Sequence, residues 1–220
     1  MFDFSTARTN MVDCQIRTAG VVGSAILQAF ETTPREKFIP QNLRSIAYTD
    51  ENLPLGEGRF LMAPVIHARM IQAAEPRPGD VALDIGGANG YPAAILSSMV
   101  TTVIALEDKQ KYLTQAKSLW DELEVCNVAG FKGKLTSGSP ENGPYDIIFM
   151  NGAVAEIPVR MVEQLAPEGR LVTIVKKPGA VLGQVTLVRS LGGKQFSSYT
   201  LFEAGMPYLS GFEPVPAFNF

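Results

Sequence analysis

From residue 81 onward, short apolar runs alternate with segments whose apolar residues recur at helical spacing. The runs VALDI, VIALE, NVAGF, YDIIFM and RLVTIV have the length and composition of buried strands. Helices are expected between them at YPAAILSSM, over residues 109–123 and near residues 157–166. Strands that alternate with helices predict parallel pairing, so we expect an α/β fold, a three-layer αβα sandwich with a mostly parallel sheet.

The end of the chain departs from this alternation. GQVTLVRS and FSSYTLFEA are separated only by LGGK and Gln195, with no helix between them, which predicts an antiparallel hairpin at one edge of the sheet. The tail at residues 205–220 is aromatic, rich in proline and almost uncharged. We expect it to pack onto the core as an extended segment, and a lid or a partner-binding surface is the alternative.

Residues 1–76 lack strand-like runs and are expected to be helical and irregular. One helix capped by Ser5 or Thr6 should reach about Thr18, and a second should begin at Ser24 and end before Pro34. PREKFIP can hold at most one helical turn, and residues 49–63 look like a loop. A further helix is expected from Pro64 to about Ala74. We thus divide one compact domain into residues 1–76, 77–204 and 205–220.

Composition excludes several functional classes. The 220 residues include 46% hydrophobic and 19% charged residues, as in ordinary globular proteins. The net charge of −3 and the scattered lysines and arginines argue against nucleic-acid binding. No apolar run approaches the roughly 18 residues that span a bilayer, and the N-terminus lacks signal-peptide features. Two cysteines and a single histidine offer no metal constellation, and we expect a cytoplasmic protein.

The segment DIGGANGY follows the first strand and opens a helix, where backbone amides can approach a ligand. Glu107 closes the second strand, 21 positions after Gly86, where a carboxylate can accept hydrogen bonds from ribose hydroxyls. Such a unit serves a nicotinamide dinucleotide or S-adenosylmethionine equally well, and a plain tight turn beside a solvated acid is the simplest alternative. G-G-A-N-G departs from G-x-G-x-x-G, which weakens the dinucleotide interpretation. Asp84 should be paired, because it ends a buried strand.

Four stretches occur in a specific order: residues 11–40, NLPLGEGR, VALDIGGANGYPAAIL, and YDIIFMNGAVAEIP followed by QLAPEGRLV. In this order and spacing the chain resembles the protein-L-isoaspartate O-methyltransferase family over nearly its whole length. The resemblance implies a Rossmann-like methyltransferase sheet with an unusual order of its last strands. It implies S-adenosylmethionine as cofactor, S-adenosylhomocysteine as product, and repair of isoaspartyl residues in damaged protein or peptide substrates.

The resemblance also implies the residues of the site. Cofactor contacts are expected at Asp84, Gly86, Gly87, Ala88, Gly90, Tyr91, Glu107, Lys134, Leu135 and Asn151. Substrate contacts are expected at Arg59, Leu61, Ala63, Pro64 and His67, although a lone histidine more often packs and Arg59 could simply cover the surface. No general base is needed, because the acceptor carboxylate is ionised at pH 7 and the enzyme mainly positions it.

Three positions depart from the family pattern. Met62 stands where the family has the serine of G-x-x-I-S-x-P, and it can only line the substrate site, since a thioether has no donor. Ala88 replaces the central glycine of the cofactor loop, and Lys134 replaces an aspartate expected near adenine. These changes leave two interpretations open: a methyltransferase with a shifted substrate, or a ligand-binding or regulatory relative without the chemistry. The N-terminal cap disfavours a nicotinamide-dependent oxidoreductase.

Overall fold

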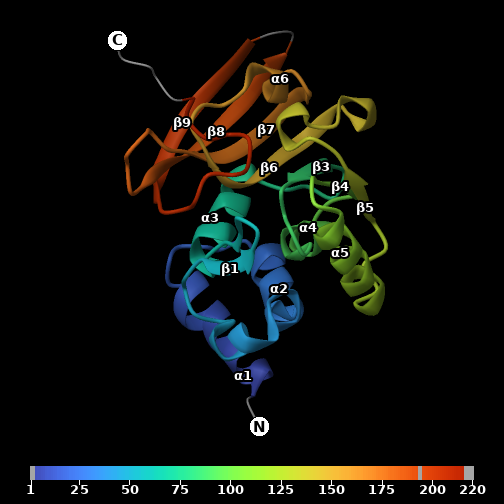
Figure 1. The fold of residues 1–220 in the computed structure, drawn as a ribbon, viewed down its shortest axis with the longest axis vertical. Helices are drawn as coiled ribbons and strands as arrows, with labels where there is room; N and C mark the ends of the chain where they lie inside the picture. Colours follow the sequence, from blue (N-terminus) through green and yellow to red (C-terminus); the bar gives the residue numbers. More distant parts are fainter. Residues whose placement is uncertain (1–2, 193–194, 216–220) are drawn as a thin grey trace.

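The computed structural model describes residues 3–192 and 195–215, and its centre is a seven-stranded sheet (Figure 1). The strand order is β5-β4-β3-β6-β7-β8-β9. Five strands run parallel: β3 (Val81–Ile85), β4 (Thr102–Glu107), β5 (Val128–Lys132), β6 (Tyr145–Val154) and β7 (Leu165–Val175). The last two, β8 (Gly183–Gly192) and β9 (Gln195–Ala204), pair antiparallel in chain order. The predicted α/β class and the edge hairpin are confirmed.

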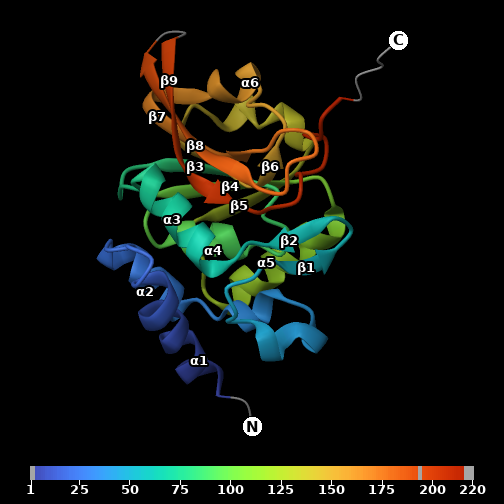
Figure 2. The ribbon, with the colours of Figure 1, turned by 90° about the vertical axis from the view of Figure 1, so that its left-hand side faces the viewer.

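Helices and loops cover both faces of the sheet. Alternate strand residues point to opposite sides, and the strands carry apolar residues on both sides, so both faces must be buried. On β4, Val103 and Ala105 join a core shared with the N-terminal region, whereas Ile104 and Leu106 join a core beneath α6 and the tail. α4 (Tyr91–Ser97) and α5 (Gln110–Glu122) lie on the first side, and α6 (Val159–Val162) lies on the second (Figure 2). α6 is shorter than predicted because β7 already begins at Leu165.

The N-terminal region contains α1 (Phe4–Met11), α2 (Ser24–Thr32) and α3 (Pro64–Ala74), which pack below the sheet (Figure 1). The first helix differs from expectation at its start. Asp3 is its cap, since this carboxylate accepts both the amide and the hydroxyl of Thr6. A π-helical turn, Val12–Ile16, continues the helix and Arg17 keeps helical backbone angles, in agreement with the predicted end at about Thr18.

Residues 49–63 are not a plain loop, because they contain the hairpin of β1 (Leu53–Gly56) and β2 (Arg59–Leu61). Its turn needs left-handed backbone at three consecutive residues, with φ of 96° at Gly56, 48° at Glu57 and 76° at Gly58. Pro54 in the first strand and the two glycines of the turn therefore made a short hairpin look like an irregular segment. The hairpin places Arg59 above the carboxyl end of β4, and the contact with Glu107 described below fixes it there.

The tail crosses the carboxyl ends of β3 and β6 as an extended segment. Ala153 donates its amide to the carbonyl of Pro207 at 2.9 Å and accepts the amide of Leu209 at 2.8 Å. Leu209 and Phe212 are buried. The tail therefore packs on the core through Met206, Leu209 and Phe212, and residues 216–220 lie outside the described part. In the described ranges, no helix is long and apolar enough to cross a membrane.

Candidate active site

Asp84 is the second-last residue of β3, two positions before the glycine loop begins at Gly86, and it is buried. Its Oδ1 accepts the Nδ2 of Asn151 at 2.6 Å, and the same Nδ2 donates to the carbonyl of Ile85. Oδ2 has no hydrogen-bond partner among the described residues. Burial without a counter-cation raises the pKa of Asp84 from 3.8 to about 7, the Asn151 hydrogen bond lowers it, and the charge of Glu107 adds to the rise. The site thus holds an acceptor without a partner.

Glu107 ends the neighbouring strand β4 and has the opposite surroundings. Its Oε1 accepts Arg59 Nη2 at 2.9 Å and the amides of Asp108 and Lys109. Its Oε2 accepts Arg59 Nε at 3.3 Å and the Ala88 amide at 3.1 Å. Arg59 also donates to Asp108 at 2.6 Å. The view of Arg59 as a surface residue is corrected, because it is 2% exposed and binds the carboxylate expected to hold ribose.

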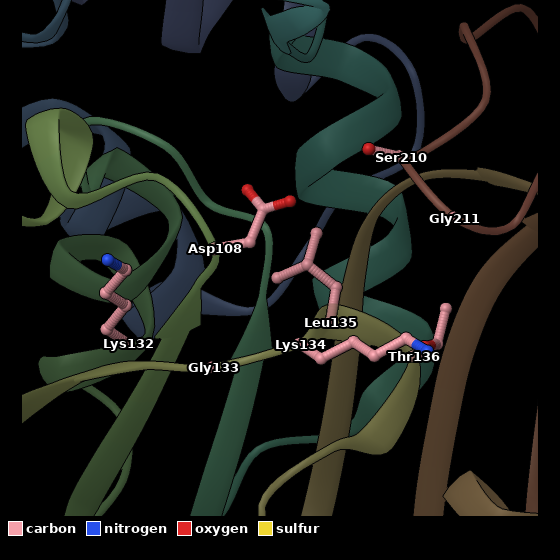
Figure 3. A pocket seen from close by; sticks show the side chains of 8 residues that line it. All are labelled: Asp108, Lys132, Gly133, Lys134, Leu135, Thr136, Ser210 and Gly211. Atoms are coloured by element: carbon pink, nitrogen blue, oxygen red, sulfur yellow. The ribbon is translucent and has the colours of Figure 1, made fainter.

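Two adjoining spaces lie at these strand ends. A crevice of only about 10 Å³ is bordered by residues of the glycine loop and of β4, among them Asp84, Gly87, Ala88, Gly90 and Glu107. Beside it lies an open hollow of about 550 Å³ (Figure 3). Its lining residues are Asp108, Lys132, Gly133, Lys134, Leu135, Thr136, Ser210 and Gly211. Of the ten predicted cofactor residues, five border the crevice and two line the open hollow, whereas Gly86, Tyr91 and Asn151 border neither.

The glycine loop is held by contacts that explain its sequence. A Cβ at Gly87 would lie 2.3 Å from Asp84 Oδ2, so glycine is required beside that carboxylate. Ala88 adopts φ of 50°, in the left-handed region that favours glycine. The departure from glycine at this position therefore places an alanine where the backbone favours glycine. Its amide nevertheless supports Glu107.

The predicted substrate segment runs from β2 into α3, but its side chains are buried. Leu61 and Met62 are each 2% exposed. The Met62 carbonyl accepts Arg35 Nη2 at 2.8 Å, and Met62 itself belongs to the core shared with the N-terminal region. Ala63 caps α3 and donates its amide to Asn52, while Pro64 occupies the first turn. As arranged, this segment offers backbone and apolar surface rather than polar side chains.

His67 and Tyr91 were expected in the site, but both side chains point into an aromatic cluster. The His67 ring lies 5.3 Å from Phe30, 5.9 Å from Tyr91 and 5.4 Å from Phe149, centroid to centroid. Neither ring nitrogen has a hydrogen-bond partner in the described part of the chain. Burial, with the charge of Arg35, lowers the pKa of His67 to about 3. These side chains pack between the cap and the sheet, so their contact with a ligand stays a prediction.

Three neighbours of the site escaped prediction. Leu209 from the tail lies on Gly86, where an added Cβ would come within 2.6 Å of its Cδ1. Trp120 from α5 donates its indole Nε1 to the Gly90 carbonyl at 3.0 Å. Ser210 and its neighbours close the hollow from the tail side. The helical period of α5 could have indicated Trp120, because this residue follows Ala116 by four positions. No local signal in the sequence could place the tail.

The family model for protein-L-isoaspartate(D-aspartate) O-methyltransferase matches residues 7–194. The chain belongs to this family. A protein-L-isoaspartate O-methyltransferase of Roseiflexus castenholzii is 39% identical over 170 residues, which cover 77% of this chain and 78% of that protein. One from Methanoculleus marisnigri is 34% identical over 201 residues, covering 84% and 91% of the two chains. The family predicted from the sequence is confirmed.

Solved structures agree on the fold. A structure described as a protein-L-isoaspartate O-methyltransferase has a TM-score of 0.80 and 25% identity. It covers 92% of this chain, which spans 66% of the length of that one. A Plasmodium falciparum protein described as a methyltransferase of this type, in complex with S-adenosyl-L-homocysteine, has a TM-score of 0.77 at 19% identity and covers 92% and 98% of the two chains. The Rossmann-like methyltransferase fold is thereby confirmed.

Proposed function

We propose that the protein is a cytoplasmic methyltransferase that takes the methyl group of S-adenosylmethionine and transfers it to the carboxylate of an isoaspartyl residue in a damaged protein or peptide. The observation that carries the proposal is the free Oδ2 of Asp84 beside Gly87, at the carboxyl ends of β3 and β6, in a chain of this family. A buried carboxylate without a cation is suited to an ammonium group of a ligand. The methionine portion of the cofactor carries such a group.

The hollow and Glu107 fit the remaining parts of that cofactor, the purine and the ribose. The hollow between Asp108, Leu135 and Ser210 is large enough for a purine ring, and Leu135 offers it an apolar wall. Lys134 lines the same hollow and can donate but not accept a hydrogen bond, so it would meet a ring nitrogen rather than an amino group. Glu107 is the carboxylate for the ribose. When bound, the cofactor supplies a sulfonium methyl group.

The acceptor needs position more than acid–base chemistry. A carboxylate is ionised at pH 7, so its oxygen can attack the methyl carbon in line while the sulfur keeps the bonding electrons. The loop of Leu61, Met62 and Ala63 would exclude water and place the peptide by backbone contacts. With a thioether at Met62, the site forgoes one hydrogen bond of about 1–3 kcal/mol, up to two orders of magnitude in rate.

A second candidate is a relative that binds an adenosyl ligand without transferring methyl. The buried Met62 side chain and the left-handed Ala88 favour it, because both alter the positions that the family pattern reserves for serine and glycine. It keeps the ligand site around Asp84 and gives up the acceptor site. The two candidates differ only in the methyl transfer step.

The test is methyl transfer to an isoaspartyl peptide, with the matching aspartyl peptide as control, by wild type, Met62→Ser and Met62→Ala. The two variants remove similar buried volume, so only the hydroxyl distinguishes them. We expect Met62→Ser to exceed Met62→Ala by about tenfold in rate. If Met62→Ser stays inert while the protein binds S-adenosylhomocysteine, the isoaspartyl substrate is wrong and the second candidate stands.

A further inference from the structure

The carboxylate of Glu107 is fully occupied before any ligand arrives. Its two oxygens accept five hydrogen bonds, two from Arg59 and three from the amides of Ala88, Asp108 and Lys109. A carboxylate offers about four lone-pair sites. Two ribose hydroxyls would therefore find no free acceptor on Glu107 in this arrangement. The guanidinium is itself enclosed, with its side chain 1% exposed.

The space agrees with the hydrogen bonds. The crevice around Ala88, Gly90 and Glu107 measures about 10 Å³, whereas the hollow beyond Asp108 measures about 550 Å³. Small-molecule sites usually require about 300–1,000 Å³. A purine can enter the hollow without rearrangement, but the sugar attached to it must open the crevice. Asp84 borders the same crevice, so it is the occupied hydrogen bonds of Glu107 that place the competition on the side of the ribose.

Arg59 is carried by a hairpin that is fastened at a second place. Tyr112 of α5 donates its hydroxyl to the carbonyls of Leu55 and Gly56 at 3.1 and 2.7 Å. Glu57 at the turn lies 3.9 Å from Lys109 and 3.5 Å from Lys111. These contacts hold the hairpin against α5 independently of Glu107. Arg59 can thus leave Glu107 while β1 and β2 stay in place.

We propose that Arg59 competes with the ribose of the adenosyl ligand for Glu107, so that the ligand binds only after the guanidinium has moved away. This inference rests on the proposed cofactor. Asp108 gives Arg59 an alternative partner, because its carboxylate already accepts Arg59 Nη2 at 2.6 Å and its side chain is 31% exposed. Arg59 is therefore a residue that sets the affinity and selectivity of the site for nucleosides.

The experiment is calorimetric titration of the full chain with S-adenosylhomocysteine, and then with adenosine and 2′,3′-dideoxyadenosine. Arg59→Met removes the competing donors and keeps much of the side-chain length. We expect it to bind S-adenosylhomocysteine at least about tenfold more tightly than wild type. Its preference for adenosine over the dideoxy compound should also exceed that of wild type, because the hydroxyls then reach Glu107.

Arg170→Met is the matched control. Arg170 is also 2% exposed and donates to a buried acid, Asp80, at 2.8 Å, but it lies between α3 and β7. Its replacement should destabilise the protein without raising its affinity for any of the three ligands. Arg59→Lys is the second variant should Arg59→Met fail to fold. A single ammonium replaces the two-pronged guanidinium, so its affinity for S-adenosylhomocysteine should also exceed that of wild type, by a smaller factor.

Equal or weaker binding of S-adenosylhomocysteine by a folded Arg59 variant would overturn the inference, since Arg59 would then support the site instead of competing for it. So would an unchanged preference between the two nucleosides. These outcomes are separable from the proposed function, which is judged by methyl transfer in wild type. Tighter binding by the variant together with no transfer by wild type would uphold the inference and refute the function, and transfer by wild type without tighter binding by the variant would do the reverse.

Discussion

Asp84 and Glu107 are two buried carboxylates at the ends of neighbouring strands, yet their surroundings are opposite. Asp84 has one side-chain donor, Asn151, and an oxygen without a partner in the described structure. Glu107 has a guanidinium and three backbone amides. The carboxyl ends of β3 and β4 thus hold Asp84, which has no cationic partner among the described residues, and Glu107, which is already paired with Arg59.

This difference shows which part of a ligand each acid can accept. Asp84 gains from an ammonium group, because a charge partner offsets the cost of its burial. Glu107 gains nothing until Arg59 moves, because its hydrogen bonds are already satisfied. The site therefore has a free acceptor for the amino group of a ligand, whereas the acceptor for its sugar is already occupied.

The largest effect on the free energy of unfolding is expected from Glu107→Gln, which removes the charge of the paired carboxylate. Arg59 would keep only Asp108 as a charged partner, and removal of one member of a buried pair costs about 3–5 kcal/mol. Urea denaturation measures the loss in the free energy of unfolding. The control is Glu122→Gln, whose partner Lys37 is also exposed, so its loss should be below about 1 kcal/mol. Equal losses for the two variants would show that Arg59 has no special need of Glu107.

Asp84→Asn addresses the unpaired side. The pKa of Asp84, about 7, exceeds its usual 3.8, so the folded state holds a proton that the unfolded chain has lost between these pH values. Stability from this group therefore falls as pH rises toward 7, and the folded protein carries the full penalty above it. Asp84→Asn should raise the free energy of unfolding by about 2–3 kcal/mol more at pH 8 than at pH 5.

Thermal or urea unfolding at the two pH values measures this change. The control is the exposed Asp121→Asn on α5, for which a change within about 0.5 kcal/mol is expected at either pH. A gain for Asp84→Asn that does not depend on pH would show that the carboxyl group is not held in its neutral form.

The sequence was sufficient for the strands and for the positions of both acids, because each ends an apolar run and the glycine loop follows the first. It was insufficient for the contact between Arg59 and Glu107, which are 48 residues apart and meet only through the β1–β2 hairpin. The local sequence pattern likewise could not predict that the side chains of His67 and Tyr91 pack against the cap, because their burial depends on Phe30 and Phe149 from distant elements. Leu209 reaches Gly86 only because the tail returns across the sheet.

The smallest effect is expected from Ala88→Gly, which tests how the loop supports Glu107. Glycine adopts the left-handed backbone at this position without strain, but it also forfeits a buried methyl group and chain entropy. We expect a net gain of about 0.5 kcal/mol in the free energy of unfolding. Ala105→Gly on β4, which lines the same crevice on an ordinary strand, should lose about 1 kcal/mol. A loss of similar size in both variants would mean that Ala88 is not strained.

The central claim is that Asp84 lacks a cation which the ligand supplies. The most direct measurement is the ¹³C chemical shift of the Asp84 carboxyl group as a function of pH, with and without S-adenosylhomocysteine. We predict a pKa of about 7 in the free protein. With the ligand bound, the pKa should fall below about 5, because the ammonium group favours the ionised form. A pKa near 4 in the free protein, or one that the ligand leaves unchanged, would contradict the account.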